Sequence, residues 1–469
     1  MLPKPENHAI WPCVILADKP TVMTITAQEK AFLFPEGQSY GLTIISINED
    51  EPFYYEPKTH RHLTVDAHEG VLRFESVFPG EQEHLIILER EGKKLQEFTV
   101  FSLYEDLYRL EALKGDLHAH SFRSDGKRDP AALAGHFREQ GYDFFALTDH
   151  NRFYPGGEID ETYSGIQLGI TRVLGEEVHT PGTSVHIVHV GGQSSVADTY
   201  VHHPDVYARE LSDCEQRIPA HVPEKYRSRY ACAMWTTERI HQAGGLAIFP
   251  HPYWRPGASR MYNVCDEFTL LLLNSGMFDA YELAGGMGQP GVNRSVALWG
   301  ELRAQGAAFP VVGSSDVHGL ENSVSFPYLF TLCFAEANSN DSICEAVKNG
   351  LCVAVETSMD GTEYRCYGSL RLVTYAQFLL KNFFPRRLRI CQGEGAAMWA
   401  YALGDADAVL IESQVQQSEV FRKRFFGRLP APLPSAATLA FEAKWREVQL
   451  AGPLTKGGRI DAPPVTRQI

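Results

Sequence analysis

Apolar runs that end in polar residues are the feature that most constrains the fold of this chain. After Leu113 such runs alternate with helix-like stretches, and they read GYDFFALTDH, SVHIVHVGG, GGLAIFPHP, MFDAYELAGG and GAAFPVVGSSDVH. Each run has the length and apolar content of a buried parallel strand. Residues 130–140 are expected to form one of the intervening helices, with Asp129 as N-cap and Pro130 at the first position. Repeated units of this kind predict an α/β barrel or a doubly wound sheet, whose reactive groups collect at the carboxyl ends of the strands.

Different patterns precede and follow this α/β region. Between residues 21 and 110, short alternating segments such as YGLTIISIN and HLIILER are separated by turn residues, which predicts a small antiparallel β-sandwich over residues 1–112. The strand and helix units occupy residues 113–366. Amphipathic segments in residues 367–469 predict a helical C-terminal extension that ends in a loose tail. A length of 469 residues suits more than one folding unit.

Composition and charge exclude several classes of protein. A hydrophobic content of 44% excludes disorder as the global state. The net charge of −15 disfavours a nucleic acid as the main partner, and no apolar run approaches the length of a membrane span. The nine cysteines form no CxxC pair, so neither a disulfide framework nor a thiolate zinc site is predicted. We expect a cytoplasmic protein with a small-molecule substrate, and the sequence leaves its oligomeric state open.

Histidines and carboxylates gather at the predicted strand ends. His118 and His120 in GDLHAHS lie two residues apart, so their imidazoles leave the same face of a strand. The candidate metal ligands, in chain order, are His118, His120, Asp125, His150, Glu177, His186, His251, Asp316 and His318. So many buried polar groups at one edge of a sheet require cations. Imidazoles and carboxylates without a thiolate favour Zn²⁺, Mn²⁺ or Fe²⁺, and the number of ligands implies two or three ions.

Two of these ligand positions have a neighbouring alternative. In VHIVHVG, His189 is the alternative to His186, and a spacing of three sends the two side chains to opposite faces of a regular strand. In GEE, Glu176 is the alternative to Glu177.

Three further residues are candidates for catalysis. Asp149 precedes His150 and is expected to orient that imidazole by accepting its free N–H, with capping of a helix as the alternative. Arg152 and Arg255 follow strand-end motifs and are candidates to hold a phosphate through bidentate hydrogen bonds. For both arginines the alternative is an ordinary place on the surface.

The order of these motifs resembles a known family. HxH, a downstream Asp or His, TDH, GxE, an isolated His, HP and DxH occur here as GDLHAHS, SDG, LTDHN, GEE, VHIVHVG, PHPY and SSDVH. Residues 114–366 thereby resemble the PHP (polymerase and histidinol phosphatase) domain, and the wording is most similar to the carbaryl-hydrolase-like branch of these metallohydrolases. The resemblance implies a distorted (β/α)7 barrel behind a β-rich segment.

The resemblance also implies how the ligands divide among the ions. His118, His120, Glu177 and Asp316 would hold one ion, and Glu177 would bridge to a second ion held by His186 and His251. A third ion would take Asp125, His150 and His318, with Asp125 at a position where some members have histidine.

The expected activity is hydrolysis by a metal-bridging hydroxide. A phosphate ester of a small molecule suits such a centre best, because its oxygens can span the ions while the leaving group departs in line. One alternative is a carbamate, ester or amide hydrolase on the same metal centre. Another is a non-catalytic, metal-stabilised binding module.

Overall fold

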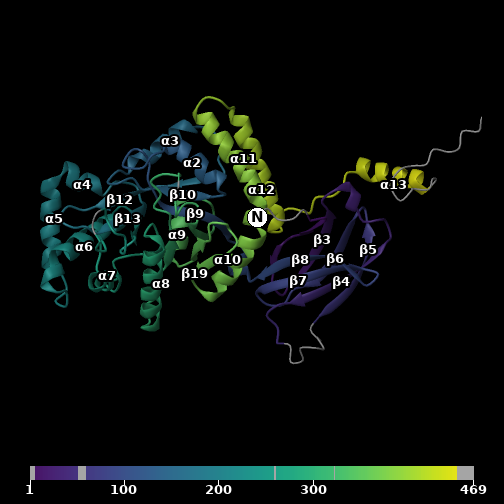
Figure 1. Ribbon diagram of the computed structural model, residues 1–469, viewed down its shortest axis with the longest axis horizontal. Coiled ribbons are helices and arrows are strands. Elements are labelled where there is room, and N and C mark those ends of the chain that lie inside the picture. The colour runs from purple at the N-terminus through teal and green to yellow at the C-terminus, as the bar shows by residue number, and fades with distance from the viewer. Residues whose placement is uncertain (1–5, 51–59, 258–259, 322, 451–469) are drawn as a thin grey trace, which may run out of the picture. The chain divides into compact units, whose positions relative to one another are not determined.

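The computed structural model describes residues 6–50, 60–257, 260–321 and 323–450 (Figure 1). The described chain forms two compact units. The first unit contains Asp106–Phe421, and the second unit combines residues 6–105 with residues 422–450. The predicted divisions at residues 112 and 366 stay predictions. The tail expected to be loose falls mainly on residues 451–469, which lie outside the described residues.

The second unit is built on one eight-stranded sheet in the order β1-β3-β6-β5-β4-β7-β8-β2. Its strands are β1 (His8–Trp11), β2 (Val14–Leu16), β3 (Pro20–Ala27), β4 (Ser39–Ser46), β5 (Arg61–His68), β6 (Val71–Val77), β7 (Gln82–Arg90) and β8 (Lys93–Leu103). All neighbours are antiparallel except β2 and β8. The first part of β5 pairs with β4 and its last two residues pair with β6. The expected antiparallel strands are therefore present, while the two-layered sandwich stays a prediction because β5 joins all of them.

The first unit contains two mixed sheets with helices around them. One sheet has the order β11-β10-β9-β17-β18-β19 and the other the order β12-β13-β14-β15-β16. The strands of the six-stranded sheet are β9 (Glu111–Ala119), β10 (Phe144–Leu147), β11 (Thr171–Val173), β17 (Leu329–Ala335), β18 (Cys352–Thr357) and β19 (Tyr364–Tyr367). Those of the five-stranded sheet are β12 (Gly175–His179), β13 (His186–Gly191), β14 (Gly245–Phe249), β15 (Ala280–Ala284) and β16 (Val311–Gly313).

Single bridges join the two sheets at the strand ends. Ala119, at the end of β9, bridges Val317 after β16, and His150, after β10, bridges Glu177 in β12. Both bridges are parallel. The residues that follow β9, β10 and β16 are thereby brought to the same region as β12. The mixed α/β class is confirmed, and the seven-stranded barrel stays a prediction.

One predicted strand runs in the opposite direction to the expectation. β13, within SVHIVHVGG, is antiparallel to both β12 and β14, so the prediction that this run is a parallel strand is wrong. The short connection from β12 to β13, residues 180–185, explains the reversal, since a parallel neighbour needs a much longer crossover. His186 therefore lies at the start of its strand and still faces the region where β10 and β14 end.

Helices surround the sheets of this unit. They are α1 (Glu105–Tyr108), α2 (Pro130–Glu139), α3 (Gly157–Thr162), α4 (Ala197–His202), α5 (Pro204–Gln216), α6 (Arg227–Gln242), α7 (Asp266–Leu273), α8 (Gly288–Ala304), α9 (Asn340–Lys348), α10 (Leu370–Asn382), α11 (Phe384–Ala402) and the part of α12 (Ala408–Phe425) up to Phe421. A further helix, α13 (Ala436–Leu450), belongs to the other unit. The predicted start of α2 is confirmed, because Asp129 accepts hydrogen bonds from the backbone N–H groups of Ala131 and Ala132.

The helix α11 packs closely on α2. A Cβ atom on Gly395 would overlap with backbone atoms of Gly135 and Glu139, so glycine is needed where the two helices approach. Beside this contact the buried Arg138 on α2 donates to Glu394 on α11 at 2.7 Å. The C-terminal helices up to Phe421 consequently belong to the same compact unit as the two sheets.

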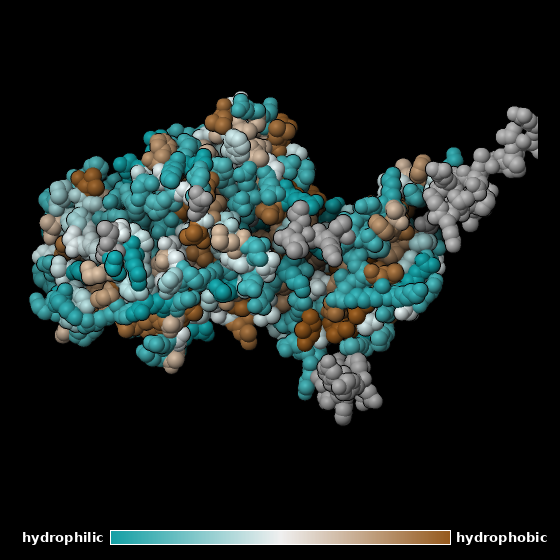
Figure 2. All heavy atoms as spheres, in the orientation of Figure 1, coloured by the Kyte–Doolittle hydropathy of each residue, from teal (hydrophilic) through white to brown (hydrophobic). Residues whose placement is uncertain are grey.

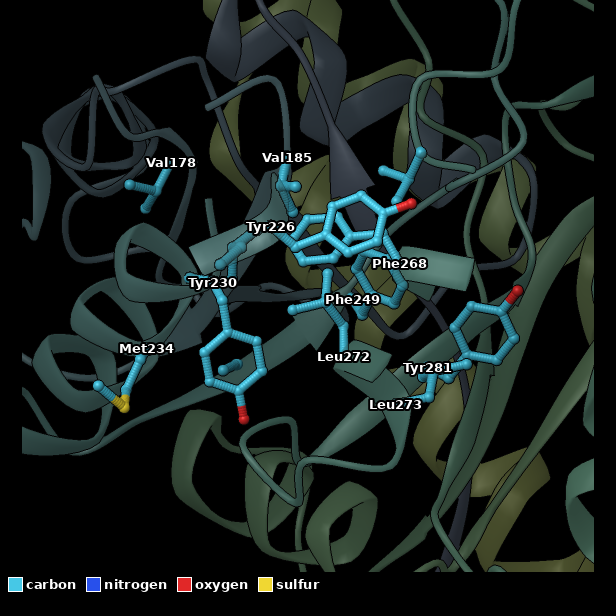
Figure 3. Packing of buried hydrophobic residues seen from close by; sticks show 14 of the residues in the cluster. Val178, Val185, Tyr226, Tyr230, Met234, Phe249, Phe268, Leu272, Leu273 and Tyr281 are labelled. Atoms are coloured by element: carbon cyan, nitrogen blue, oxygen red, sulfur yellow. The ribbon is translucent and has the colours of Figure 1, made fainter. Parts of the chain in front are cut away.

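An aromatic and aliphatic core supports the strands that carry the histidines. It joins α6, α7, β14 and β15 around Trp235, Phe249 and Tyr281. Figure 3 shows part of this cluster, in which the rings of Tyr226 and Phe268 stack with centroids 4.8 Å apart. Because the interior is closely packed, the ends of these strands are held in fixed positions.

The surface is mixed in hydropathy. Figure 2 shows a mainly hydrophilic face on which apolar residues form scattered spots. Among the helices that the structure describes, none combines the length and the apolar character needed to cross a bilayer.

Candidate metal centre

The nine predicted ligands lie together in the first unit. They come from the ends of β9, β10, β14 and β16, from the loop after His120, from β12 and from the start of β13. Backbone hydrogen bonds hold these segments against one another: Asp316 N donates to His118 O at 3.0 Å, and Glu177 N donates to Thr148 O at 3.0 Å.

Two histidines and two carboxylates form the first ligand set. His118 Nε2 lies 3.2 Å from Glu177 Oε2 and 3.4 Å from Asp316 Oδ1. His120 Nε2 lies 3.4 and 3.1 Å from the same two oxygens. Atoms that share one ion at about 2.0–2.2 Å from it lie about 3–4 Å apart. The four side chains therefore have the spacing of a single coordination sphere.

The other oxygen of Glu177 faces a second ligand set. Its Oε1 lies 2.7 Å from His186 Nδ1 and 3.2 Å from His251 Nε2. One carboxylate thus presents each of its oxygens to a different group of imidazoles. That arrangement suits a carboxylate that bridges two cations.

The third predicted set is closer to solvent. Asp125 Oδ2 lies 3.3 Å from His150 Nε2, and Asp125 Oδ1 lies 3.2 Å from His318 Nε2. The Asp125 side chain keeps 54% of its surface exposed. Water can therefore solvate the third set, whereas the side chains of the first two sets are mostly buried.

His179 joins the cluster although the sequence did not nominate it. It lies on β12 two residues after Glu177, and its Nε2 is 3.7 Å from Glu177 Oε1. The rings of His179 and His186 are stacked with centroids 3.8 Å apart, as expected for the cross-strand pair that they form. The alternation of GEEVH, which places residues 177 and 179 on one face, is the signal that could have identified it.

Glu282 is a second residue that the sequence did not nominate. Its Oε2 lies 2.9 Å from His118 Nδ1, and both side chains are fully buried. A carboxylate only accepts, so the proton is on Nδ1 and the lone pair of Nε2 faces the first ligand set. A carboxylate inside the apolar strand AYELA is the signal in the sequence.

Burial and neighbouring charges shift the pKa values of the cluster in opposite directions. Burial alone would lower the pKa of His120, but the close carboxylates of Asp316 and Glu177 outweigh burial and raise it to about 9. Burial likewise opposes ionisation of Glu177, yet the charge of His118 and the close approach of the other imidazoles hold its pKa well below the usual range. For His186 burial dominates, and it lowers the pKa to about 4.

Several buried nitrogens in the cluster have no hydrogen-bond partner within the described chain. They are His118 Nε2, both ring nitrogens of His120, His150 Nδ1, His179 Nε2, His186 Nδ1 and His251 Nδ1. A buried polar atom without a partner costs about 1–3 kcal/mol. Imidazole nitrogens and carboxylate oxygens that face one another at about 3–4 Å have the separation of two ligands of one ion. They fit a divalent cation such as Zn²⁺, Mn²⁺ or Fe²⁺ between them.

The neighbouring alternatives point away from the cluster. Glu176 accepts hydrogen bonds from Ser195 Oγ at 2.8 Å and from Val196 N at 2.5 Å. His189 lies beside Glu176, with Nδ1 3.4 Å from its Oε1, and its ring stacks on Phe153. Alternation along β12 and β13 therefore brings Glu177 and His186 to the cluster and leaves the other pair on the opposite face.

Asp149 makes its side-chain hydrogen bonds with two serines, and its expected role in orienting His150 stays a prediction. Its carboxylate accepts hydrogen bonds from Ser121 N at 2.8 Å and from the hydroxyl groups of Ser121 and Ser124 at 2.6 Å. The two ring nitrogens of His150 lie 3.3 Å from Asp125 Oδ2 and 3.0 Å from Glu177 Oε2. Asp149 fixes the loop that carries Asp125.

The candidate arginines differ in what holds them. Arg255 donates to Tyr262 Oη at 3.3 Å and lies over its ring. Arg152 is exposed, two residues after His150, and among the described residues no side chain pairs with its guanidinium. Of the two, Arg152 has the charge that is more available to a ligand.

The backbone is strained at the cluster. Asn151, His251 and Asp316 have positive φ angles of 55°, 21° and 52°, which non-glycine residues adopt at a cost. A Cβ atom on Gly286 would approach Asp316 Cβ to 2.7 Å, so glycine gives this aspartate its room. Strain of this kind is concentrated at functional sites, because the surrounding structure must maintain it.

Comparison with known proteins gives only distant structural likenesses. No protein-family model matches the chain, and no curated protein matches it. A two-domain protein from Bacteroides vulgatus, described as containing a predicted PHP-like metal-dependent phosphoesterase, is 19% identical, with 52% of this chain and 65% of that chain covered and a TM-score of 0.36. This chain thus spans slightly less than two thirds of that protein.

Two further solved structures are similar at the same level. A candidate metal-dependent phosphoesterase from Bifidobacterium adolescentis is 18% identical over 50% of this chain and 96% of that chain, with a TM-score of 0.33. An amidohydrolase from Chromobacterium violaceum is 19% identical over 45% of this chain and 89% of that chain, with a TM-score of 0.31. Similarity at this level assigns no family or branch, so the argument for function rests on the geometry of the cluster.

Proposed function

We propose that this protein is a metal-dependent hydrolase of the PHP type, and that it acts as a phosphoesterase on a small phosphorylated molecule. The observation that carries the proposal is the position of Glu177, whose two oxygens face separate groups of imidazoles at 2.7–3.4 Å. Two or three divalent ions bound there would lower the pKa of a water molecule and neutralise charge on a phosphate.

The side chains of this protein prepare the centre for such ions. Glu177 links the first and second ligand sets. Glu282 fixes the tautomer of His118, so that Nε2 is available to a cation. Asp149 holds the loop of Asp125 through its serine hydrogen bonds. Arg152, exposed beside His150, is placed to bind a phosphate oxygen or a charged leaving group.

The finer description of the fold belongs to the same proposal. The bridges Ala119 to Val317 and His150 to Glu177 connect β9 with the end of β16 and β10 with β12. Together with the ladders of the two sheets they support a ring of seven strands, β9, β10, β12, β13, β14, β15 and β16. Nine cysteines with free thiols support a reduced, cytoplasmic compartment.

A carbamate, ester or amide hydrolase is the second candidate, and one observation favours it. Arg255 donates to Tyr262 Oη, and Arg294 forms an ion pair with Asp266, which leaves Arg152 as the one of these three guanidinium groups that is available to a ligand. An uncharged carbonyl group needs less positive charge from side chains than a phosphate does.

Turnover of matched aryl substrates separates these candidates. Metal-loaded protein is incubated with an aryl phosphate, an aryl carbamate and an aryl acetate that share one leaving group. We expect phosphate hydrolysis that is lost in Glu177→Gln and kept in the control His202→Ala, whose side chain is 64% exposed on α4. Turnover of the carbamate or acetate alone would reject the phosphoesterase, and metal binding without any turnover would favour a non-catalytic module.

A further inference from the structure

His150 has ligand atoms on two sides. Its Nε2 faces Asp125 at 3.3 Å, and its Nδ1 faces Glu177 Oε2 at 3.0 Å. A neutral imidazole has one lone pair for a cation and one N–H, so the two sides compete. The Nε2 side leads to Asp125 and His318, and the Nδ1 side leads to Glu177 and His179.

Burial distinguishes the two sides. On the inner side, His150 Nδ1 and His179 Nε2 are buried atoms without a hydrogen-bond partner among the described residues. On the outer side, the exposed Asp125 accepts the N–H of an imidazole or contacts water equally well. An ion on the inner side therefore satisfies two such atoms. The outer side has one, His120 Nδ1, and this nitrogen would carry the proton of the ring if His120 Nε2 holds the first ion.

The position of His179 is well defined. Its backbone N–H donates to Asn151 Oδ1 at 2.7 Å, and Tyr200 Oη donates to the same oxygen at 2.6 Å. Stacking on His186 fixes the plane of the ring. The distance of 3.7 Å from His179 Nε2 to Glu177 Oε1 is too long for a hydrogen bond, and it lies within the separation of about 3–4 Å expected for two ligands of one ion.

We propose that His179 is a metal ligand, and that with His150 and Glu177 it forms a binding set on the inner side of His150, in preference to the outer set of Asp125 and His318. One ligand atom from each of these three residues lies within 4.8 Å of the others. The inference rests on the metal-binding part of the proposed function, and it does not depend on which bond is hydrolysed.

A thiolate placed at the position tests the coordination directly. The full-length His179→Cys variant is loaded with Co²⁺, and its absorption spectrum is compared with that of the control His202→Cys, which has the same substitution on the exposed face of α4. None of the nine native cysteines belongs to the cluster. We expect a thiolate-to-cobalt charge-transfer band in the near ultraviolet for His179→Cys alone. Its absence in both variants overturns the proposal.

Metal affinity gives a second, independent measurement. His179→Phe keeps a ring for stacking on His186 but has no nitrogen, and Asp125→Asn weakens only the outer set. Chelator competition with Zn²⁺ should show affinity for one ion reduced at least about tenfold in His179→Phe, with little change in Asp125→Asn. The reverse order, or no loss in either variant, contradicts the inner set.

The two proposals fail in distinguishable ways. If the unmodified protein binds ions without hydrolysing any substrate and His179→Cys shows the band, the ligand assignment holds and the hydrolase does not. If hydrolysis is present and the band is absent, only the ligand assignment is overturned. A protein that binds no divalent ion at all rejects both.

Discussion

Glu282 Oε2 lies 2.9 Å from Nδ1 of His118 in a part of the first unit where neither side chain has contact with solvent. The two residues are 164 positions apart in the chain and come from β15 and β9. Because a carboxylate only accepts, this contact fixes the proton on Nδ1 and aims the lone pair of Nε2 at Glu177 and Asp316.

Removal of this charge should weaken metal binding without removing a ligand. We expect Glu282→Gln to lower the affinity for the first ion about 10–100-fold, because an amide no longer enforces the tautomer or raises the basicity of His118. Chelator competition measures the loss. Glu301→Gln, the same substitution at an exposed position of α8, serves as the control. Equal affinities in the two variants would show that Glu282 does not position the ligand.

The pH dependence of stability should change direction with metal loading. Without metal, the pKa of His120 is raised from 6.5 to about 9 by its carboxylate partners, against the effect of burial. Its stabilising contribution is then complete below about pH 6.5 and is lost as the pH rises through about 9. With metal bound, stability should increase with pH over the same range, since only deprotonated imidazoles bind ions.

Thermal unfolding between pH 5 and pH 9, with and without a chelator, measures this difference. Parallel pH profiles for the two samples would contradict a metal centre at these histidines.

The contact between α2 and α11 should not tolerate a methyl group. Gly395→Ala places a Cβ atom against backbone atoms of Gly135 and Glu139, and we expect it to lower the free energy of unfolding by about 1–3 kcal/mol. Gly300→Ala is the matched control, because that Cβ meets nothing within 4 Å and alanine favours a helix by about 0.5–1 kcal/mol. Denaturant unfolding compares both variants, and a neutral Gly395→Ala would mean that the helices separate readily.

The buried charges beside this contact should be strongly coupled. Arg138 donates to Glu394 at 2.7 Å and to Asp143 at 3.3 Å, with all three side chains buried. We expect Arg138→Met to destabilise the protein by about 3–5 kcal/mol, since the buried carboxylate of Glu394 loses the guanidinium with which it forms an ion pair. Chemical denaturation of Arg138→Met and of the double variant Arg138→Met/Glu394→Gln tests this coupling, and the double variant should recover part of the loss.

Arg152 should affect phosphate substrates selectively. Its exposed guanidinium lies two residues after His150, so Arg152→Ala should raise KM for an aryl phosphate about tenfold and leave an aryl acetate unchanged. Steady-state kinetics with Arg255→Ala, whose side chain is already held by Tyr262, provides the comparison. A larger effect in Arg255→Ala would reverse the assignment of the two arginines.

Local patterns in the sequence determined which side chains were available and which faces they occupied. The spacing of two in His118 and His120, and the alternation in GEE and VHIVHVG, depend on the period of a single strand, which is a property of neighbouring residues. The start of α2 was equally local, because Asp129 caps the two N–H groups that follow it.

Only the tertiary structure decided which of these side chains meet. The reversal of β13 depends on its pairing with β12 and β14, and it brings His186 to the cluster from the start of a strand. The contact of Glu282 with His118 and the capture of Asp149 by two serines depend on segments that are distant in the chain. Such contacts depend on strand order and packing, which the period of a single strand does not encode.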